Sequence, residues 1–208
     1  MWMSDKPLTQ QRLARDLADL LHVLRGKENF LGFVDAFWKT MAREWSGIDA
    51  LRMDKFLYLA RCYINQGFER VSKQKWKDEA LLQEYLKILE ITPLNATNGK
   101  IPNGIRFHVI EIYVDELDKV DVSRTAPLEV VLQPLKKLAN DSFTKAVRER
   151  ANEALKDERL SDWQNVRSDD SEEDDVKDGD QPRPRAADAA IDFDIAEEDD
   201  AEFGGFGD

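Results

Sequence analysis

Apolar residues recur at intervals of three and four along most of residues 1–160, which is the spacing of one face of an α-helix. The pattern is clearest in segment 33–70, where the Ser46-Gly47 pair separates two amphipathic runs. The first run has one broad apolar face, formed by Phe30, Phe33, Val34, Phe37, Trp38, Met41 and Trp45. The second run has two apolar stripes, formed by Phe56, Leu59, Ala60 and Tyr63 and by Met53, Leu57 and Ile64. The segment is therefore predicted to be a helical hairpin whose second helix is buried on two sides, as in the middle of a stack.

One further helix is predicted on each side of this hairpin. Residues 7–26 carry a leucine series at helical spacing, and Ser4 and Asp5 precede it as candidate N-terminal caps. Segment 81–92 carries a second apolar series, which stops before Pro93 because proline cannot continue a helix.

Segment 105–120 is ambiguous on composition alone. Its β-branched and aromatic residues suit a strand, whereas Phe107, Ile110, Val114 and Leu117 fall at helical spacing. A single strand among helices would have no partner for its backbone hydrogen bonds. The segment is therefore predicted to be a helix.

The region from Thr125 to residue 155 is predicted to hold two more helices. Pro134 should kink the first of them, and Asp141 and Ser142 are candidate caps for the second. The apolar residues of the last helix are Phe143, Val147, Ala151 and Leu155. The predicted fold class is all-α, with about seven antiparallel helices in a short HEAT-like α-solenoid or in an irregular bundle.

The charge is divided unevenly along the chain. Residues 1–160 carry 26 basic and 24 acidic side chains, whereas residues 161–208 carry 4 basic and 18 acidic ones. The first part is predicted to be one helical domain that can still present a basic patch to nucleic acid. The second part is too polar to bury a core and is predicted to be a disordered acidic tail.

The residues that usually perform catalysis or bind metals are few and scattered. His22 and His108 have no histidine or cysteine partner at ligand spacing, and Cys62 is the only cysteine. The Asn98-Gly99 and Asn103-Gly104 pairs are isolated turn signals, without the strand and lysine of a phosphate-binding loop. No catalytic, metal or cofactor site and no small-molecule substrate are therefore expected. No apolar run approaches the roughly 20 residues of a membrane span, so no membrane partner is expected.

The densest positive cluster is the most promising candidate for nucleic-acid contact. It comprises Arg61, Arg70, Lys73, Lys75, Trp76 and Lys77. The lysines could neutralise phosphates while Trp76 stacks on an unpaired base. The alternative is that the lysines belong to a solvated helix start and that Trp76 is the first core residue of the next helix.

The acidic tail contains two candidate phosphorylation sites. Ser171 precedes a run of acidic residues, a context that acid-directed kinases favour, and Ser168 lies close to it. Further along, acidic residues alternate with apolar ones, a composition that can dock onto a basic or apolar groove. The apolar residues of this part are Ile191, Phe193, Ile195, Phe203 and Phe206. A solvating tail without a fixed partner is the alternative.

Three long segments resemble the ribosomal RNA-processing protein one family, the nucleolar Nop52-like proteins of eukaryotes. They are MWMSDKPLTQQRLARDLADLL, FVDAFWKTMAREWSGIDALRMDKFLYLARCYI and NGIRFHVIEIYVDELDKV. The resemblance implies an all-α, repeat-like domain and a non-catalytic assembly factor of the pre-60S ribosomal particle, located in the nucleolus of the nucleus. The implied partners are other assembly factors and precursor rRNA.

The N-terminus departs from the pattern of that family. Its members carry further helical sequence before the motif that here runs from Trp2 to Pro7. Trp2 and Met3 are large apolar residues at an extreme terminus, which usually need a packing partner. The domain is therefore expected to lack its first helices. The alternative function is a protein-only helical adaptor that has no RNA contact and whose acidic tail binds a basic partner.

Overall fold

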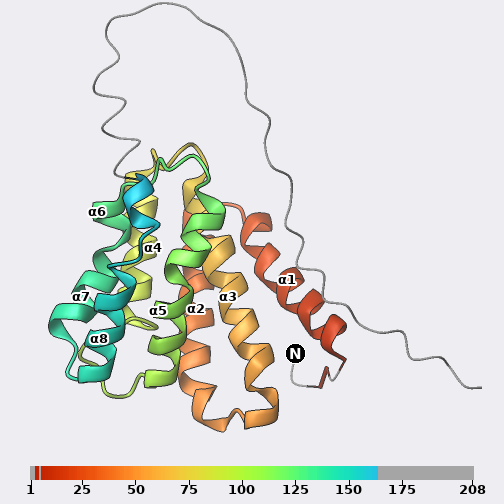
Figure 1. The fold of residues 1–208 in the computed structure, drawn as a ribbon. Coiled ribbons are helices and arrows are strands. Elements are labelled where there is room, and N and C mark those ends of the chain that lie inside the picture. Colours follow the sequence, from red (N-terminus) through yellow and green to blue (C-terminus); the bar gives the residue numbers. More distant parts are fainter. Residues whose placement is uncertain (1–2, 5, 164–208) are drawn as a thin grey trace, which may run out of the picture. The chain divides into compact units, whose positions relative to one another are not determined.

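Prolines, glycines and capping carboxylates divide the chain into helices much as the apolar spacing predicts. The computed structural model describes residues 3–4 and 6–163, and these contain eight α-helices, one short 3₁₀ turn and no strand (Figure 1). The helices are α1 (Pro7–Val23), α2 (Lys27–Glu44), α3 (Ala50–Ser72), α4 (Glu79–Ile91), α5 (Asn103–Val120), α6 (Leu128–Val131), α7 (Gln133–Asp141) and α8 (Lys145–Ala154). The predicted all-α fold is confirmed. Ser168, Ser171 and most of the predicted acidic tail lie outside the described residues.

The helix boundaries have identifiable causes. Asp49 caps α3 by accepting a hydrogen bond from the Arg52 amide at 3.0 Å, and Asp78 caps α4 by accepting one from the Leu81 amide at 3.2 Å. Pro134 stands in the first turn of α7, immediately after the break that ends α6. The predicted interruption at this proline is confirmed.

The start of α1 differs in one detail from the prediction. Pro7 occupies the first turn as expected, but the capping position belongs to Lys6, and no side chain forms a cap hydrogen bond there. Ser4 instead uses its backbone oxygen, which accepts hydrogen bonds from the side chains of Gln10 at 2.7 Å and Lys55 at 2.9 Å. The prediction that Ser4 caps the helix was wrong, because its carbonyl rather than its hydroxyl makes these contacts.

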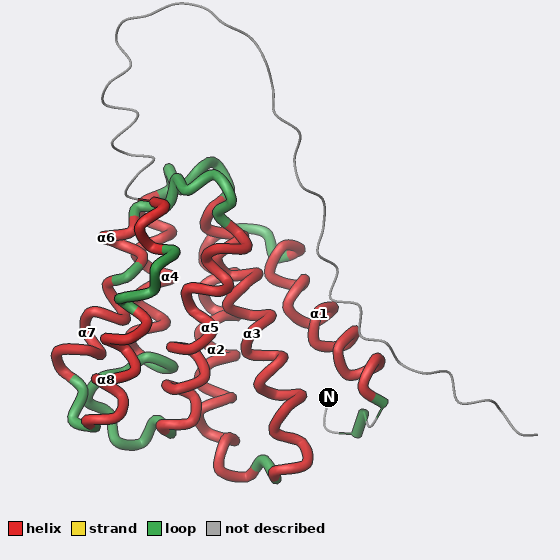
Figure 2. Tube along the Cα trace, in the orientation of Figure 1, coloured by secondary structure: helices red, strands yellow, loops and turns green. Residues whose placement is uncertain are grey.

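The helices alternate between two layers. In one layer α3 lies between α1 and α5, and α8 follows on the far side of α5 (Figure 1). The other layer contains α2, α4 and α7, in which α4 contacts both of its neighbours. Because successive long helices run in opposite directions, the loops collect at two ends of the layers, as Figure 2 shows. This alternation is the arrangement of a short α-solenoid.

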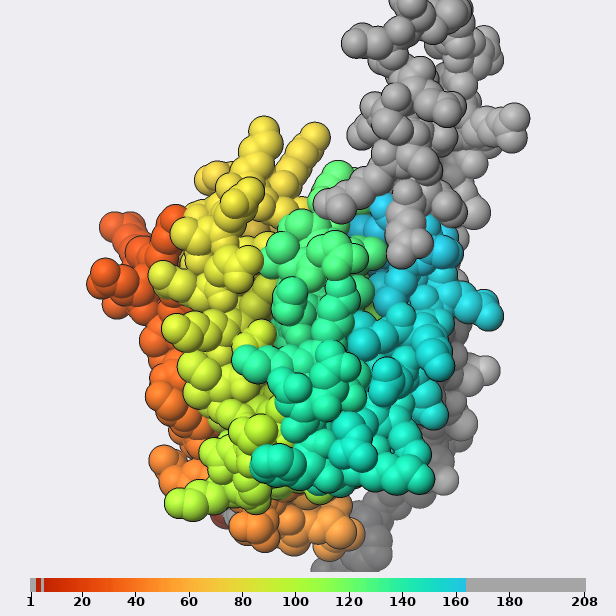
Figure 3. Space-filling view, turned by 90° about the vertical axis from the view of Figure 1, so that its left-hand side faces the viewer, coloured from red at the N-terminus to blue at the C-terminus, as the bar shows by residue number. Residues whose placement is uncertain are grey.

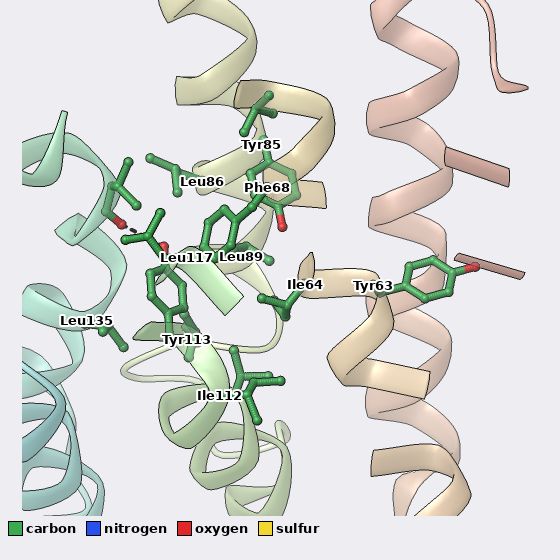
Figure 4. Close-up of a cluster of buried hydrophobic side chains, with 14 of the residues drawn as sticks. Tyr63, Ile64, Phe68, Tyr85, Leu86, Leu89, Ile112, Tyr113, Leu117 and Leu135 are labelled. Atoms are coloured by element: carbon green, nitrogen blue, oxygen red, sulfur yellow. Dashed lines mark hydrogen bonds between the residues drawn. The ribbon is translucent and has the colours of Figure 1, made fainter. Parts of the chain in front are cut away.

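Helix α3 is covered on two sides, as its two apolar stripes predict. Tyr63 extends towards α1, where its hydroxyl donates a hydrogen bond to the Leu17 carbonyl at 3.4 Å. Its ring stacks on that of Phe37 of α2, with the ring centres 3.5 Å apart. Phe68 lies between Tyr85 of α4 and Tyr113 of α5, with ring centres 6.0 and 5.1 Å away (Figure 4). The prediction of a middle helix in a stack is confirmed.

Segment 103–120 is a helix, so its ambiguous composition needs an explanation. Helix α5 buries residues on nearly every side, among them Ile112, Tyr113 and Leu117, which are fully covered. A helix that contacts neighbours on several sides has few polar positions, and its sequence then loses the amphipathic signal. The strand-like content of this segment therefore reflects its central position between α3 and α8.

The last predicted helix starts later than expected. Helix α8 begins at Lys145, and Phe143 lies in the extended turn before it with 80% of its surface exposed. Val147 and Ala151 pack in the core as predicted. The prediction that Phe143 belongs to the apolar face of this helix was wrong, because Ser142 leaves the helical conformation and turns the chain outward.

A glycine permits the close approach of α3 and α4. A Cβ atom added to Gly67 would lie 2.7 Å from Cζ and 2.8 Å from Cε2 of Tyr85, and this tyrosine is fully buried. The ring cannot withdraw without disturbing Phe68 and Phe30, which both contact it. Only a residue without a side chain fits at this crossing.

We therefore expect Gly67→Ala to lower the free energy of unfolding by about 1–3 kcal/mol, since overpacking outweighs the better helix propensity of alanine. Gly32→Ala is the matched control, because a Cβ atom at this position in α2 would meet nothing within 4 Å. That change should stabilise the protein by about 0.5–1 kcal/mol. Urea denaturation of both variants measures the difference, and equal stabilities would contradict the close approach.

Candidate nucleic-acid interface

The turn between α3 and α4 holds four residues of the predicted positive cluster, Lys73, Lys75, Trp76 and Lys77, and its backbone has an unusual conformation. Gln74, Lys75 and Trp76 have φ angles of 67°, 56° and 61°, and none of them is glycine. Such left-handed residues cost free energy and persist only where other contacts hold them. The side chain of Trp76 is only 4% exposed, and its amide donates a hydrogen bond to the Ser72 carbonyl at 3.3 Å. Trp76 therefore anchors the turn in the core.

This placement decides between the two predicted roles of the tryptophan. A buried indole offers no free face to a base, and Trp76 instead packs as a core residue at the entrance to α4. The stacking role is incompatible with the structure. Any phosphate contact at this turn depends on the lysines.

Lys73, Lys75 and Lys77 point outward from the anchored turn. All three are exposed, and the ammonium groups of Lys75 and Lys77 form no hydrogen bond or ion pair with any described residue. Lys73 Nζ lies 3.0 Å from Nδ1 of His22. Figure 3 shows side chains of this yellow segment standing out from the upper end of the molecule.

The loop between α1 and α2 lies beside this turn. Lys27 forms an ion pair with Asp78 at 2.5 Å, and this ammonium together with the Leu81 amide lowers the pKa of the Asp78 carboxyl. Arg70 donates a hydrogen bond to the Leu24 carbonyl at 3.5 Å. The exposed Arg25 follows Leu24 in this loop. Sequence reasoning missed Arg25, because a single arginine before a glycine gives no signal of its distant neighbours.

We call the surface formed by Arg25, Lys73, Lys75 and Lys77 the basic end. A hollow of about 350 Å³ adjoins it between the turn, the start of α4 and the segment that leads into α6. Its apolar lining comes from Trp76, Leu82, Pro127 and Val130, and its charged lining comes from Lys75, Lys77 and Glu79. The basic end can therefore bind an anion and accept an apolar group beside it.

Arg61 does not belong to the basic end. Its guanidinium donates to Glu116 of α5 at 2.9 Å and to Asp115 at 3.5 Å. The Glu116 side chain is 3% exposed, and it also accepts hydrogen bonds from Asn65 and Lys119 at 2.9 Å. A buried carboxylate needs such partners, so Arg61 holds α3 and α5 together.

The other groups that could carry chemistry occupy structural positions. His108 of α5 lies 2.8 Å from the Leu57 carbonyl of α3, and burial lowers the pKa of its imidazole. Burial also raises the pKa of the Cys62 thiol. Among the residues that the structure describes, no group of three or more His, Cys, Asp or Glu side chains could hold a metal ion. None of the helices in this part of the chain has the length and apolarity needed to cross a membrane.

Fold and surface together define an all-α protein of two helix layers with a lysine-bearing turn at one end. The chain belongs to the family described as nucleolar protein Nop52, whose model matches residues 1–199. The predicted resemblance is thereby confirmed.

The chain is similar to several ribosomal RNA processing proteins. It is 42% identical over 120 residues to the human ribosomal RNA processing protein 1 homolog A, an alignment that covers 58% of this chain and 26% of the relative. It is 41% identical to the human homolog B over 58% of this chain and 16% of that relative. The Dictyostelium discoideum homolog is 27% identical over 74% of this chain and 36% of its own length. The chain thus spans about a quarter of the first of these relatives.

The different placements of Arg61 and Lys75 predict different effects on stability. Arg61→Gln should lower the free energy of unfolding by about 1–3 kcal/mol, because Glu116 loses a charged partner while it stays buried. Lys75→Gln should change it by less than about 0.5 kcal/mol, because this exposed side chain has no partner to lose. Thermal denaturation of the two variants tests the assignment, and an Arg61→Gln protein as stable as Lys75→Gln would refute it.

Proposed function

We propose that this chain is a non-catalytic nucleolar assembly factor of the pre-60S ribosomal particle. In this role it scaffolds other assembly factors and supports the processing of precursor rRNA. Membership of a family described as nucleolar supports the location, and the names of the similar proteins support the link to rRNA processing. The helical fold supports a scaffold, because stacked helices present extended surfaces to partners.

The observation that carries the proposed RNA contact is the anchored turn. A flexible lysine loop would lose conformational entropy when RNA binding ordered it, which would weaken binding. Here Trp76 already fixes the backbone from which Lys73, Lys75 and Lys77 project. Lys75 and Lys77, which have no partner among the described residues, can neutralise phosphates without breaking an ion pair of the fold. Arg25 extends the same surface. The basic end is therefore the proposed contact with precursor rRNA.

A groove between α5 and α8 is the proposed contact for an assembly factor. It has a volume of about 410 Å³ and apolar lining from Phe107, Ile110, Val114 and Ala154. Arg150 lies over the Phe107 ring, 4.7 Å from its centre. Glu111, Glu153 and Asp157 line the same groove. This combination suits a partner segment with an apolar residue next to a basic one.

The hollow beside the basic end favours a second candidate, the protein-only adaptor. Leu82, Pro127 and Val130 offer an apolar floor next to two lysines, and an acidic peptide with large apolar residues would satisfy both. In that case the chain joins proteins without touching RNA, and its own acidic tail binds a basic partner.

Purification of the tagged protein from cells tests the proposed function. We expect precursor rRNA of the large subunit and known assembly factors to copurify with it. The control is a tagged, unrelated nucleolar protein expressed at the same level. Recovery of neither precursor rRNA nor assembly factors would defeat the proposal.

Charge removal at the basic end separates the two candidates. Changing Lys73, Lys75 and Lys77 together to glutamine should weaken RNA crosslinking, and it should reduce the slope of log affinity against log salt concentration by about 2. The matched control changes three exposed lysines elsewhere, Lys39, Lys87 and Lys156, and so removes the same charge. Trp76 is left intact because its loss would disturb the core. Unchanged crosslinking in the first variant would favour the adaptor.

A further inference from the structure

An exposed aromatic ring lies at the end of the helix layers opposite to the basic end. Phe143 stands in the turn between α7 and α8, and 80% of its surface is free. The loop between α4 and α5 runs beside this turn, at the lower end of the helices in Figure 1. The two segments enclose a hollow of about 210 Å³, lined by Ala96, Thr97, Ile101, Pro102, Phe143 and Thr144 among others.

The loop that forms the other wall is held by a buried arginine. Arg106 is 4% exposed, and its guanidinium donates to the carbonyls of Asn95, Asn98 and Ile101 at 2.7, 2.6 and 2.5 Å. It also donates to Oδ1 of Asn103 at 2.8 Å. All of these acceptors are neutral oxygens, so no carboxylate among them cancels the positive charge of the guanidinium.

The surroundings of the ring are poor in acidic groups. Segment 91–110 contains no Asp or Glu, and its exposed Lys100 forms no ion pair with a described residue. On the other wall Asp141 precedes the turn, and Lys145 pairs with Glu149 at 3.4 Å. Helices α5 and α8 both start here without an acidic residue in the first turn, which adds to the positive potential. The hollow therefore favours an anion.

We propose that Phe143 and the wall around Arg106 form a second RNA contact, which binds an unpaired nucleotide. The base stacks on the Phe143 ring, and Lys100 neutralises an adjacent phosphate. The positive surroundings favour this occupant over an apolar or basic protein segment, which would gain nothing from Lys100. The exposed Phe143 ring favours single-stranded over duplex RNA, because the base faces of a duplex are already stacked on one another. The inference deepens the proposed function, since it rests on the chain acting on precursor rRNA.

Binding of a short fluorescein-labelled oligouridine to the whole 208-residue chain tests this contact by fluorescence anisotropy. Phe143→Ala should weaken binding roughly tenfold, as expected for the loss of one stacked base, and Phe143→Tyr should restore it. Lys100→Gln should reduce the slope of log affinity against log salt concentration by about 0.7. The matched control is Val122→Ala, which truncates another exposed apolar residue at the far end of α5. Thermal denaturation should show all four variants folded, because these side chains lie at the surface.

Three results would overturn the inference. Equal oligouridine affinity of Phe143→Ala and the unchanged protein would exclude stacking. An equal loss for a blunt RNA duplex would show that the ring does not recognise unpaired bases. Unchanged RNA affinity together with the loss of one copurifying assembly factor would make Phe143 a protein contact. Each of these results leaves the association of the unchanged protein with precursor rRNA in cells intact, so the proposed function would fail only by the separate purification test.

Discussion

The rest of the structure depends on the burial of α3 against neighbours on two sides. This burial requires α4 to approach closely, and Gly67 makes room for the ring of Tyr85 at the crossing. The hydroxyl of Tyr85 has no hydrogen-bond partner among the described residues, which is an energetic cost that the packing of the ring must offset. Because the crossing lies just before the end of α3, it also fixes where the turn to α4 begins. The basic end is thus positioned by the core.

The C-terminal part of the fold is held by a second set of contacts around Asp121. Its carboxylate accepts hydrogen bonds from the Ala126 amide at 2.6 Å and from Nε1 of Trp163 at 2.7 Å. Burial raises the pKa of this carboxyl, but the hydrogen bonds outweigh burial and lower it. Arg124 lies over the Trp163 ring, 4.1 Å from its centre. These contacts hold Trp163, in the segment after α8, against the loop that follows α5.

Periodicity predicted the helices well, because the spacing of apolar residues directly reports which face is covered. It could not predict which aromatic residues are buried outside the helices. Trp76 and Phe143 both lie in turns, and their exposure depends on backbone angles that no spacing encodes. The role of Arg61 was equally hidden, since its partner Glu116 lies 55 residues away in sequence. The density of positive charge along the sequence therefore predicted the exposed lysines correctly, but it wrongly placed Arg61 in the same cluster.

The helix layers hold the two proposed RNA contacts apart, at opposite ends of the helices. Helix α4 connects the basic turn to the loop beside Phe143, and its 13 residues correspond to about 20 Å. A single RNA strand that reached both ends would bind the second site as an intramolecular step, and two weak contacts would then act as one stronger contact. Part of the body between the ends carries paired charges, such as Arg61 with Glu116, which are already engaged within the fold. RNA held at the ends would thus leave the groove between α5 and α8 open to a protein partner.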